Sequence, residues 1–205
     1  MPRVPDSAVR RLSLYVRCLE GIDTAATSTI SSRDLATAAG TTAAQVRKDL
    51  SRFGSFGKRG LGYPVDPLLE RLRTILGLNA EWPVMVVGAG RIGSALHAYP
   101  YFRERGFRIV AVLDDDPVKV GSEWNGTTVE HVDQMEAIIC DRGVKLLVLA
   151  VPAPAASGVA LRAARAGIRG ILNFAPARLE VPDEVVVNDV NLALEMEALA
   201  FALSR

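Results

Sequence analysis

The fold of the larger part of the chain is decided by residues 84–93, which read VMVVGAGRIG. A short apolar run ends in a glycine, and the pattern G-x-G-x-x-G follows at Gly88, Gly90 and Gly93. In such a unit the first glycine makes the turn, the second lets the backbone approach a pyrophosphate, and the third lets the helix pack on the strand. The free N–H groups at the helix start would face the anion. The stretch therefore predicts a strand, a phosphate-binding turn and a helix.

An acidic residue follows at the end of the next apolar run, where Asp114 lies 21 residues past Gly93. In this position a carboxylate accepts hydrogen bonds from the adenosine ribose hydroxyls of a dinucleotide. Asp115 and Asp116 are adjacent and would repel a 2′-phosphate, so the pattern favours NAD(H) over NADP(H). A tight turn without any ligand is the alternative reading of the glycines.

The sequence around this motif alternates between strand and helix patterns. Apolar runs stand at 84–87, 107–113, 145–151 and 168–174, and helical patterns stand between them at 92–99, 132–142 and 155–166. Continuous apolar strands joined by helices indicate a parallel sheet covered on both faces. We expect an α/β, Rossmann-like doubly wound sheet, with an edge strand near 184–187 and a final helix over 191–203.

The nicotinamide half of a bound dinucleotide would lie near Val151 and Pro152, with Phe174 nearby. A hydride-transfer enzyme needs a general acid or base beside its substrate, but residues 151–156 and 173–176 contain no His, Tyr or Lys. We therefore expect a regulator without catalytic residues, which binds its cofactor and does not consume it. An NAD-dependent oxidoreductase with a helical appendage is the alternative.

The first third of the chain differs in charge. Residues 1–78 hold 12 Lys and Arg against 7 Asp and Glu, whereas the remainder holds 12 against 16. A basic segment joined to an acidic one suggests a polyanionic partner for the basic segment. Helical spacing predicts a first helix over 6–20, and Ser31 with Asp34 is a capping pattern for a second. Thr41 or Thr42 would cap a third, which gives the outline of a helix-turn-helix.

The third helix carries Val46 and Leu50 inward, so its other faces are free to contact DNA. The predicted DNA-binding residues on it are Gln45, Arg47, Lys48 and Ser51. Residues 53–64 are rich in glycine, suit a β-hairpin wing, and add Lys58 and Arg59 to the predicted DNA contacts. A connecting helix is expected over 66–76. A small helical bundle with a solvated charged face is the alternative.

The cysteines and the hydropathy argue against a disulfide-rich, metal-binding, secreted or membrane-spanning protein. Cys18 and Cys140 are far apart and have no metal-ligand spacing, so we expect neither a disulfide framework nor a metal site, but two buried structural thiols. A thiol-based redox regulator remains an alternative. No signal-peptide pattern and no stretch of 18 apolar residues is present, so we expect a cytosolic protein without a membrane span.

Taken together, these segments resemble the Rex family of redox-sensing transcriptional repressors. The resemblance rests on QVRKDLS at 45–51, on FG at 53–54 followed by FGKRGLGY at 56–63, on the glycine turn, on DDDP with KVG within 114–121, and on GILNFAP at 170–176. It implies a homodimer with winged-helix domains over 1–78, Rossmann-like domains over 79–188 and a final helix, 189–205, exchanged between subunits. It also implies that NAD⁺ is compatible with binding to a palindromic operator, that NADH releases the repressor, and that the genes serve respiration and fermentation.

The resemblance also assigns residues. Lys48 and Arg59 match DNA-contacting positions, and the three glycines with Asp114 match NAD(H) contacts. Arg17 and Tyr99 match positions that link the two domains. Relatives usually have an acid at the start of the last helix where this chain has Asn191, so a neutral hydrogen bond would replace their charge-pair relay. The full predicted cofactor set is Gly88, Ala89, Gly90, Arg91, Ile92, Gly93, Asp114, Asp116, Lys119, Val151, Pro152 and Phe174.

Overall fold

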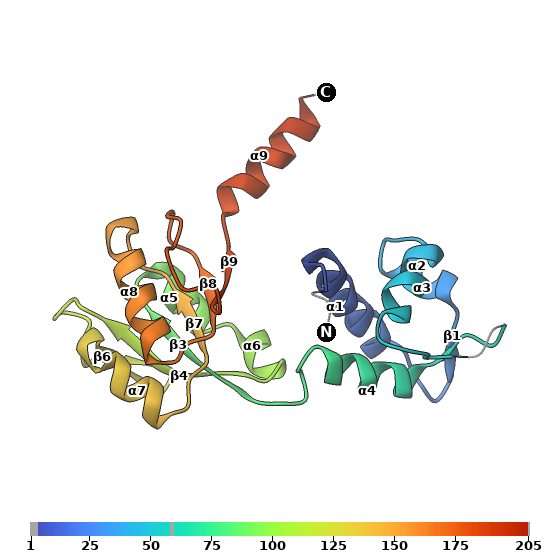
Figure 1. Ribbon diagram of the computed structural model, residues 1–205, viewed down its shortest axis with the longest axis horizontal. Helices are drawn as coiled ribbons and strands as arrows, with labels where there is room; N and C mark the ends of the chain where they lie inside the picture. Colours follow the sequence, from blue (N-terminus) through green and yellow to red (C-terminus); the bar gives the residue numbers. More distant parts are fainter. Residues whose placement is uncertain (1–3, 58–59, 205) are drawn as a thin grey trace. The chain divides into compact units, whose positions relative to one another are not determined.

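The computed structural model of the protein describes residues 4–57 and 60–204 (Figure 1). The chain forms two compact units that divide between Ala80 and Glu81. The first unit is helical, and the second is built on a sheet. Each unit is described by itself below.

Four helices make the first unit: α1 (Asp6–Glu20), α2 (Ser32–Ala38), α3 (Ala43–Ser51) and α4 (Val65–Ile75). Ser31 caps α2 by accepting a 3.1 Å hydrogen bond from the Asp34 N–H, and Thr42 caps α3 by accepting one of 3.2 Å from the Gln45 N–H. Between them Gly40 turns the chain at φ +64°. The helix-turn-helix is thus confirmed, and its core contains Leu12, Tyr15, Val16, Leu35, Val46, Leu50, Leu68 and Leu72.

The glycine-rich stretch after α3 differs from the expected hairpin. Strand β2 (Tyr63–Pro64) pairs antiparallel with β1 (Thr29–Ile30), which precedes α2, and not with another part of the stretch described in the structure. A Cβ at Gly57 would overlap the Gly62 carbonyl oxygen, so two limbs of the stretch approach too closely there for side chains. Lys58 and Arg59 lie outside the described residues.

The second unit contains a seven-stranded sheet in the order β5-β6-β4-β3-β7-β8-β9. Its strands are β3 (Trp82–Val87), β4 (Phe107–Asp114), β5 (Glu123–Trp124), β6 (Thr127–His131), β7 (Leu146–Leu149), β8 (Gly170–Asn173) and β9 (Val186–Asp189). All pairs are parallel except β5–β6, a short antiparallel hairpin that the sequence analysis did not predict. The parallel doubly wound sheet is confirmed, including its edge strand β9.

Helices cover both faces of the sheet. They are α5 (Arg91–His97), α6 (Pro100–Glu104), the 3₁₀ turn η1 (Val132–Gln134), α7 (Met135–Asp141) and α8 (Ala153–Ala166). Alternate residues of β3 point to opposite faces, as strand geometry requires. Met85 belongs to the core that includes α7 and α8, whereas Val86 belongs to a second core against which Leu96 of α5 packs. In Figure 1, α7 and α8 lie side by side.

The last helix, α9 (Leu192–Leu203), has no buried residue. It begins at Asn191, whose side-chain oxygen accepts hydrogen bonds from the N–H groups of Ala193 (3.0 Å) and Leu194 (3.4 Å). Its exposed side chains include Leu192, Leu194, Met196, Leu199 and Leu203. Apart from Glu195 and Glu197 the helix is apolar. Such an apolar surface is normally buried, so α9 presents a surface suited to a partner.

The two cysteines differ in exposure. Cys18 is half-buried against the core of the first unit, but Cys140 is exposed, so the expectation of a buried thiol is wrong there. Its neighbours Ile138 and Ile139 occupy the buried side of α7, which leaves Cys140 on the outer side. Among the helices of residues 4–57 and 60–204, none combines the length and apolar character needed to cross a bilayer.

Candidate functional site

A cleft of about 720 Å³ opens at the carboxyl ends of the central strands. From β3 the chain builds the sheet outward through β4, then returns to β7 on the other side, which creates the switch point where ligands bind such sheets. Two hydrogen bonds of 2.8 Å hold the strand ends together: the Gly88 N–H donates to the Leu113 carbonyl, and the Ala150 N–H donates to the Val87 carbonyl. The cleft floor is therefore fixed by the backbone.

The three glycines of the turn have different structural roles. At φ +106°, Gly88 adopts a backbone conformation that disfavours other residues, and a Cβ there would overlap the Ala150 carbonyl. A Cβ at Gly93 would overlap the Gly88 carbonyl, so this glycine allows α5 to pack on the turn. A Cβ at Gly90 would meet nothing within 4 Å. Gly90 lines the cleft, where the absence of a side chain leaves room for a phosphate group.

Asp114 fastens this turn to the end of β4. Its carboxylate is 7% exposed and accepts hydrogen bonds from the N–H groups of Ala89 (2.6 Å) and Asp116 (2.9 Å). Lys119 Nζ lies 3.2 Å from one carboxylate oxygen and 3.3 Å from the other. Burial opposes ionisation, but these hydrogen bonds outweigh it and lower the pKa of Asp114 below its usual value. Asp114 thus holds the turn in shape, and its carboxylate oxygens could also accept a hydrogen bond from a ribose hydroxyl.

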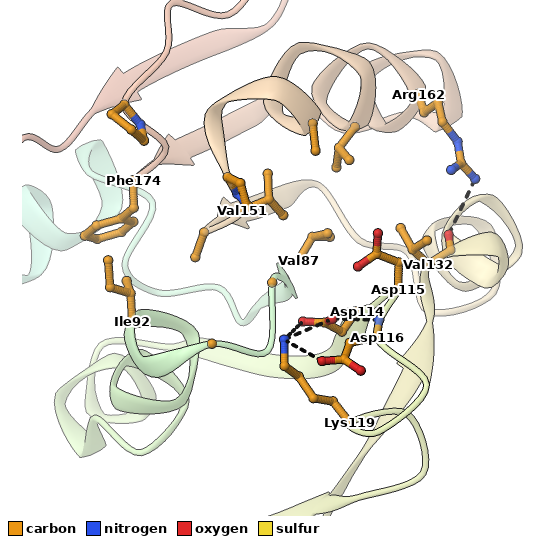
Figure 2. A pocket seen from close by; sticks show the side chains of 17 residues that line it. Val87, Ile92, Asp114, Asp115, Asp116, Lys119, Val132, Val151, Arg162 and Phe174 are labelled. Carbon is orange, nitrogen blue, oxygen red and sulfur yellow. Dashed lines mark hydrogen bonds and ion pairs between the residues drawn. The ribbon is translucent and has the colours of Figure 1, made fainter.

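Two further carboxylates line the same end of the cleft (Figure 2). Asp116 lies 3.5 Å from Lys119 Nζ, and its side chain is 40% exposed. Burial opposes the charge of Lys119, but Asp114 and Asp116 raise its pKa above the usual value. Asp114 and Asp116 face the ammonium group, and Asp115 adds a third carboxylate to the lining, so this end is net negative. It favours hydroxyl donors and disfavours an additional phosphate.

The opposite wall of the cleft is mostly apolar and includes Val151, Pro152, Val159 and Phe174 (Figure 2). Arg162 lies on the side of Asp115 and Val132, away from Phe174 (Figure 2), and its Nε and Nη2 donate to the Glu136 carboxylate at 2.9 and 3.0 Å. The hydrogen bond from Arg162 lowers the pKa of Glu136. Between the glycine turn and the Arg162 guanidinium, the cleft therefore offers an apolar surface on which a flat ring could pack.

The structure brings together most of the predicted cofactor residues. Nine of the twelve line the cleft: Gly88, Gly90, Ile92, Asp114, Asp116, Lys119, Val151, Pro152 and Phe174. Of the rest, Ala89 binds Asp114, Gly93 packs behind the turn, and Arg91 is exposed at the start of α5. The lining residues outside the predicted set are Val87, Asp115, Val132, Ala150, Ala155, Val159, Arg162 and Pro176. The spacing of 155, 159 and 162 on one helical face was the signal available for three of them.

A second cleft of about 620 Å³ continues from the first, because Ile92, Phe174 and Pro176 line both. Its rim is formed by Asp189 and the first turn of α9. Asn173 is 1% exposed, and its Nδ2 donates to Asp189 Oδ1 at 2.8 Å. The same Nδ2 donates to the Ala177 carbonyl at 3.0 Å, and Asn173 Oδ1 accepts from the Ala175 N–H at 3.0 Å. Asp189 is therefore fixed by a buried amide.

The predicted DNA-contacting residues on α3 lie at its surface. Lys48 and Ser51 are exposed, and Arg47 donates from Nη1 to Ser32 Oγ at 3.0 Å, which links α3 to the start of α2. The side chain of Gln45 is only partly exposed, and its Nε2 donates to Asp49 Oδ1 at 2.8 Å. Lys58 and Arg59, the other predicted contacts, are outside the described residues.

A buried carboxylate beneath this surface was not predicted. Asp49 on α3 is fully buried and accepts two hydrogen bonds from Arg11 of α1, at 2.6 and 2.9 Å. It also accepts one from the Tyr15 hydroxyl at 3.0 Å. Burial opposes the charge, but these donors together with Gln45 lower the pKa of Asp49. Asp49 thus ties α1 to α3, and its place between Val46 and Leu50 on the buried face was the available signal.

The three residues of the predicted relay lie on separate elements. Arg17 is in α1, Tyr99 precedes α6 with its ring 5.4 Å from that of Phe102, and Asn191 caps α9. The Asn191 oxygen is engaged by the helix backbone. Their joint action remains a prediction.

Comparison with known proteins covers both units. A family described as "CoA binding domain" matches residues 79–177, and one described as "Putative DNA-binding protein N-terminus" matches residues 3–51. The chain is 48% identical to the redox-sensing transcriptional repressor Rex of Carboxydothermus hydrogenoformans, covering 99% of this chain and 98% of that protein. It is 46% identical to Rex of Streptomyces coelicolor, covering 97% of this chain and 77% of that protein.

Two solved structures are similar over nearly the whole chain. One is RSP in complex with β-NAD⁺ and operator DNA, with a TM-score of 0.93, 35% identity, and coverage of 99% of this chain and 94% of that one. The other is RSP in complex with β-NADH, with a TM-score of 0.88, 33% identity, and coverage of 99% and 95%. RSP itself is described as a Rex-family repressor.

Proposed function

Because the chain belongs to the Rex family of redox-sensing transcriptional repressors, we propose that it binds operator DNA through its first unit and senses NAD(H) through its second. The observation that carries this function is the likeness, over 99% of the chain, to a relative solved with both β-NAD⁺ and operator DNA. Members of the family are named as repressors and not as enzymes.

The cleft at the switch point would hold the dinucleotide. Gly90 and the start of α5 would receive the pyrophosphate, because backbone N–H groups at a helix N-terminus favour an anion. Asp114, which also keeps the turn in shape, would accept from the adenosine ribose hydroxyls, with Asp116 beside it. The nicotinamide would lie between Val151 and Phe174. Reduction removes the positive charge of that ring, and a neutral ring costs less to bury against apolar walls.

The lining of the clefts supports a sensed ligand over a reactant. Among the described residues that line them, Lys119 is the sole Lys, His or Tyr, and it lies at the Asp114 end. No such group stands beside Val151 and Phe174 to transfer a proton to a substrate. The NAD-dependent oxidoreductase is therefore the weaker reading.

Lys48, Arg47 and Ser51 on α3 would contact the operator, with Lys58 and Arg59 contacting it from the stretch after α3. Gln45 would take part through its amide oxygen, since its nitrogen is held by Asp49. We further propose a cytoplasmic homodimer that binds a palindromic site and exchanges α9, because this helix has no buried residue and an apolar surface. The three-part division at 78/79 and 188/189, and the relay through Arg17, Tyr99 and Asn191, belong to the same proposal.

The test is an operator titration at fixed salt with excess NAD⁺ or NADH. We expect NADH to weaken operator binding by roughly 5- to 150-fold, the range of typical allosteric coupling. Lys48→Ala should weaken operator binding with either nucleotide while NADH affinity is kept, because the residue lies in the other unit. Equal operator affinity in NAD⁺ and NADH would refute the redox switch.

A further inference from the structure

Charged side chains beside the second cleft could act differently on the two redox forms of the ligand. Where the nicotinamide ring would lie, NAD⁺ carries a positive charge and NADH carries none, so a charged side chain near the ring acts on one form only. At the start of α9, Asn191 is neutral and its side-chain oxygen is engaged in capping the helix. Among the described residues that line the second cleft, the charged side chains are Asp189 and Arg178.

Asp189 is the carboxylate in that position. It lines the second cleft together with Ile92 and Phe174, residues that also line the first cleft at its nicotinamide end. Its Oδ1 accepts a 2.8 Å hydrogen bond from Asn173, a side chain that is 1% exposed and is itself fixed by two backbone groups. A carboxylate on a surface loop moves freely, whereas this one is held at the end of β9 by a buried partner.

We propose that Asp189, positioned by Asn173 on the rim of the second cleft, is the residue that distinguishes the two redox forms by attracting the ring charge that only NAD⁺ carries. Arg178 is the other charged side chain among the described residues that line this cleft, and it acts in the opposite direction. This inference rests on the proposed function, and it adds a residue that sets the redox preference of the site.

The expected size follows from Coulomb's law. A unit charge near the ring, at the high effective dielectric constant of an exposed rim, changes an affinity by roughly three- to tenfold. The effect should shrink as salt is raised, since exposed charges are screened. Because NAD⁺ and NADH compete for one site, weaker NAD⁺ binding would also lower the NADH/NAD⁺ ratio at which the protein leaves its operator.

The experiment is a calorimetric titration of the full-length protein with NAD⁺ and with NADH. We expect Asp189→Asn to weaken NAD⁺ binding by roughly three- to tenfold and to leave NADH binding within about twofold. Asp189→Glu should keep the wild-type preference, and Asp189→Lys should shift it further than Asn. Arg178→Gln should shift the preference in the opposite direction, toward NAD⁺. Asp183→Asn, in the exposed turn before β9 and outside the lining of the second cleft, is the matched control and should change neither affinity.

The charge series separates electrostatics from structural damage, because damage would weaken both nucleotides and would not follow the sign of the charge. If the Asp189 variants change both affinities equally, or neither, the inference is wrong while the proposed function stands. If the wild-type protein binds neither nucleotide, the proposed function fails and this inference fails with it.

Discussion

Removal of the Asp49 carboxylate should destabilise the first unit and leave the second unchanged. In Asp49→Ala, the Tyr15 hydroxyl, on a side chain with no exposed surface, loses its acceptor, which costs about 1–3 kcal/mol. Arg11 loses its ion pair, but 26% of its side chain is exposed and water compensates in part, so we assign about 1 kcal/mol. With about 0.5–1.5 kcal/mol for the Gln45 hydrogen bond, the total is about 2.5–5.5 kcal/mol.

The placement of the tryptophans offers a direct assay. Trp82 and Trp124 both lie in the second unit, whereas far-UV circular dichroism reports the helices of both. During urea unfolding, Asp49→Ala should move the dichroism transition of the first unit to lower denaturant and leave the fluorescence transition in place. In a Tyr15→Phe background the same substitution should cost about 1–2 kcal/mol less, because the hydroxyl that it would strand is gone.

The sign of the pH dependence is also fixed. The pKa of Asp49 is lower in the folded protein than the value of about 3.9 in an unfolded chain. The contribution of the Asp49 charge to the free energy of unfolding is therefore complete above about pH 4, and it is lost as the pH falls through the pKa of Asp49 in the folded protein. In Asp49→Ala, the stability of the first unit should no longer contain this acid-sensitive contribution. A cost below about 1 kcal/mol, or an equal shift of both transitions, would refute the argument that Asp49 supports α3 from within.

Two further predictions concern the second unit. Gly88→Ala should weaken NADH binding by roughly tenfold or more, because φ +106° costs alanine about 1–2 kcal/mol and its Cβ would overlap the Ala150 carbonyl. The control is Gly158→Ala in α8, where a Cβ meets nothing within 4 Å. This variant should leave the NADH affinity measured by titration unchanged. Burial lowers the pKa of His97, so the stability of this unit, followed by tryptophan fluorescence, should be complete above about pH 6.5 and fall as the pH drops through the folded value. His97→Gln should remove that decline, and a variant that keeps it would locate the titrating group elsewhere.

Local signals made much of the fold predictable. The Ser31–Asp34 cap, the glycine at position 40 and the apolar runs each act within a few residues, and each element they predict is present. The β5–β6 hairpin was missed although Asn125-Gly126, both with positive φ, is a strong hairpin signal. Its first strand, β5, has two residues and is too short to show an alternating pattern.

The site was predictable only in part for a similar reason. The glycine turn and Asp114 are a contiguous motif, so their residues could be named from spacing. Val132 lines the cleft because η1 and α7 pack beside α8, a tertiary fact that no short pattern contains, whereas Arg162 shares one helical face with Ala155 and Val159. The inward direction of Asp49 could be inferred from its place between Val46 and Leu50, but its partners Arg11 and Tyr15 lie on another helix and could not be named from spacing.

The apolar surface of α9 has a consequence for how much of the protein a cell must contain. If a second copy covers Leu194, Leu199 and their neighbours, the assembled repressor exists only above the concentration at which two chains associate. Below that abundance, operators would be vacated by dilution alone, whatever the nucleotide pool. Copy number would then set a lower limit on the range in which the redox signal is read.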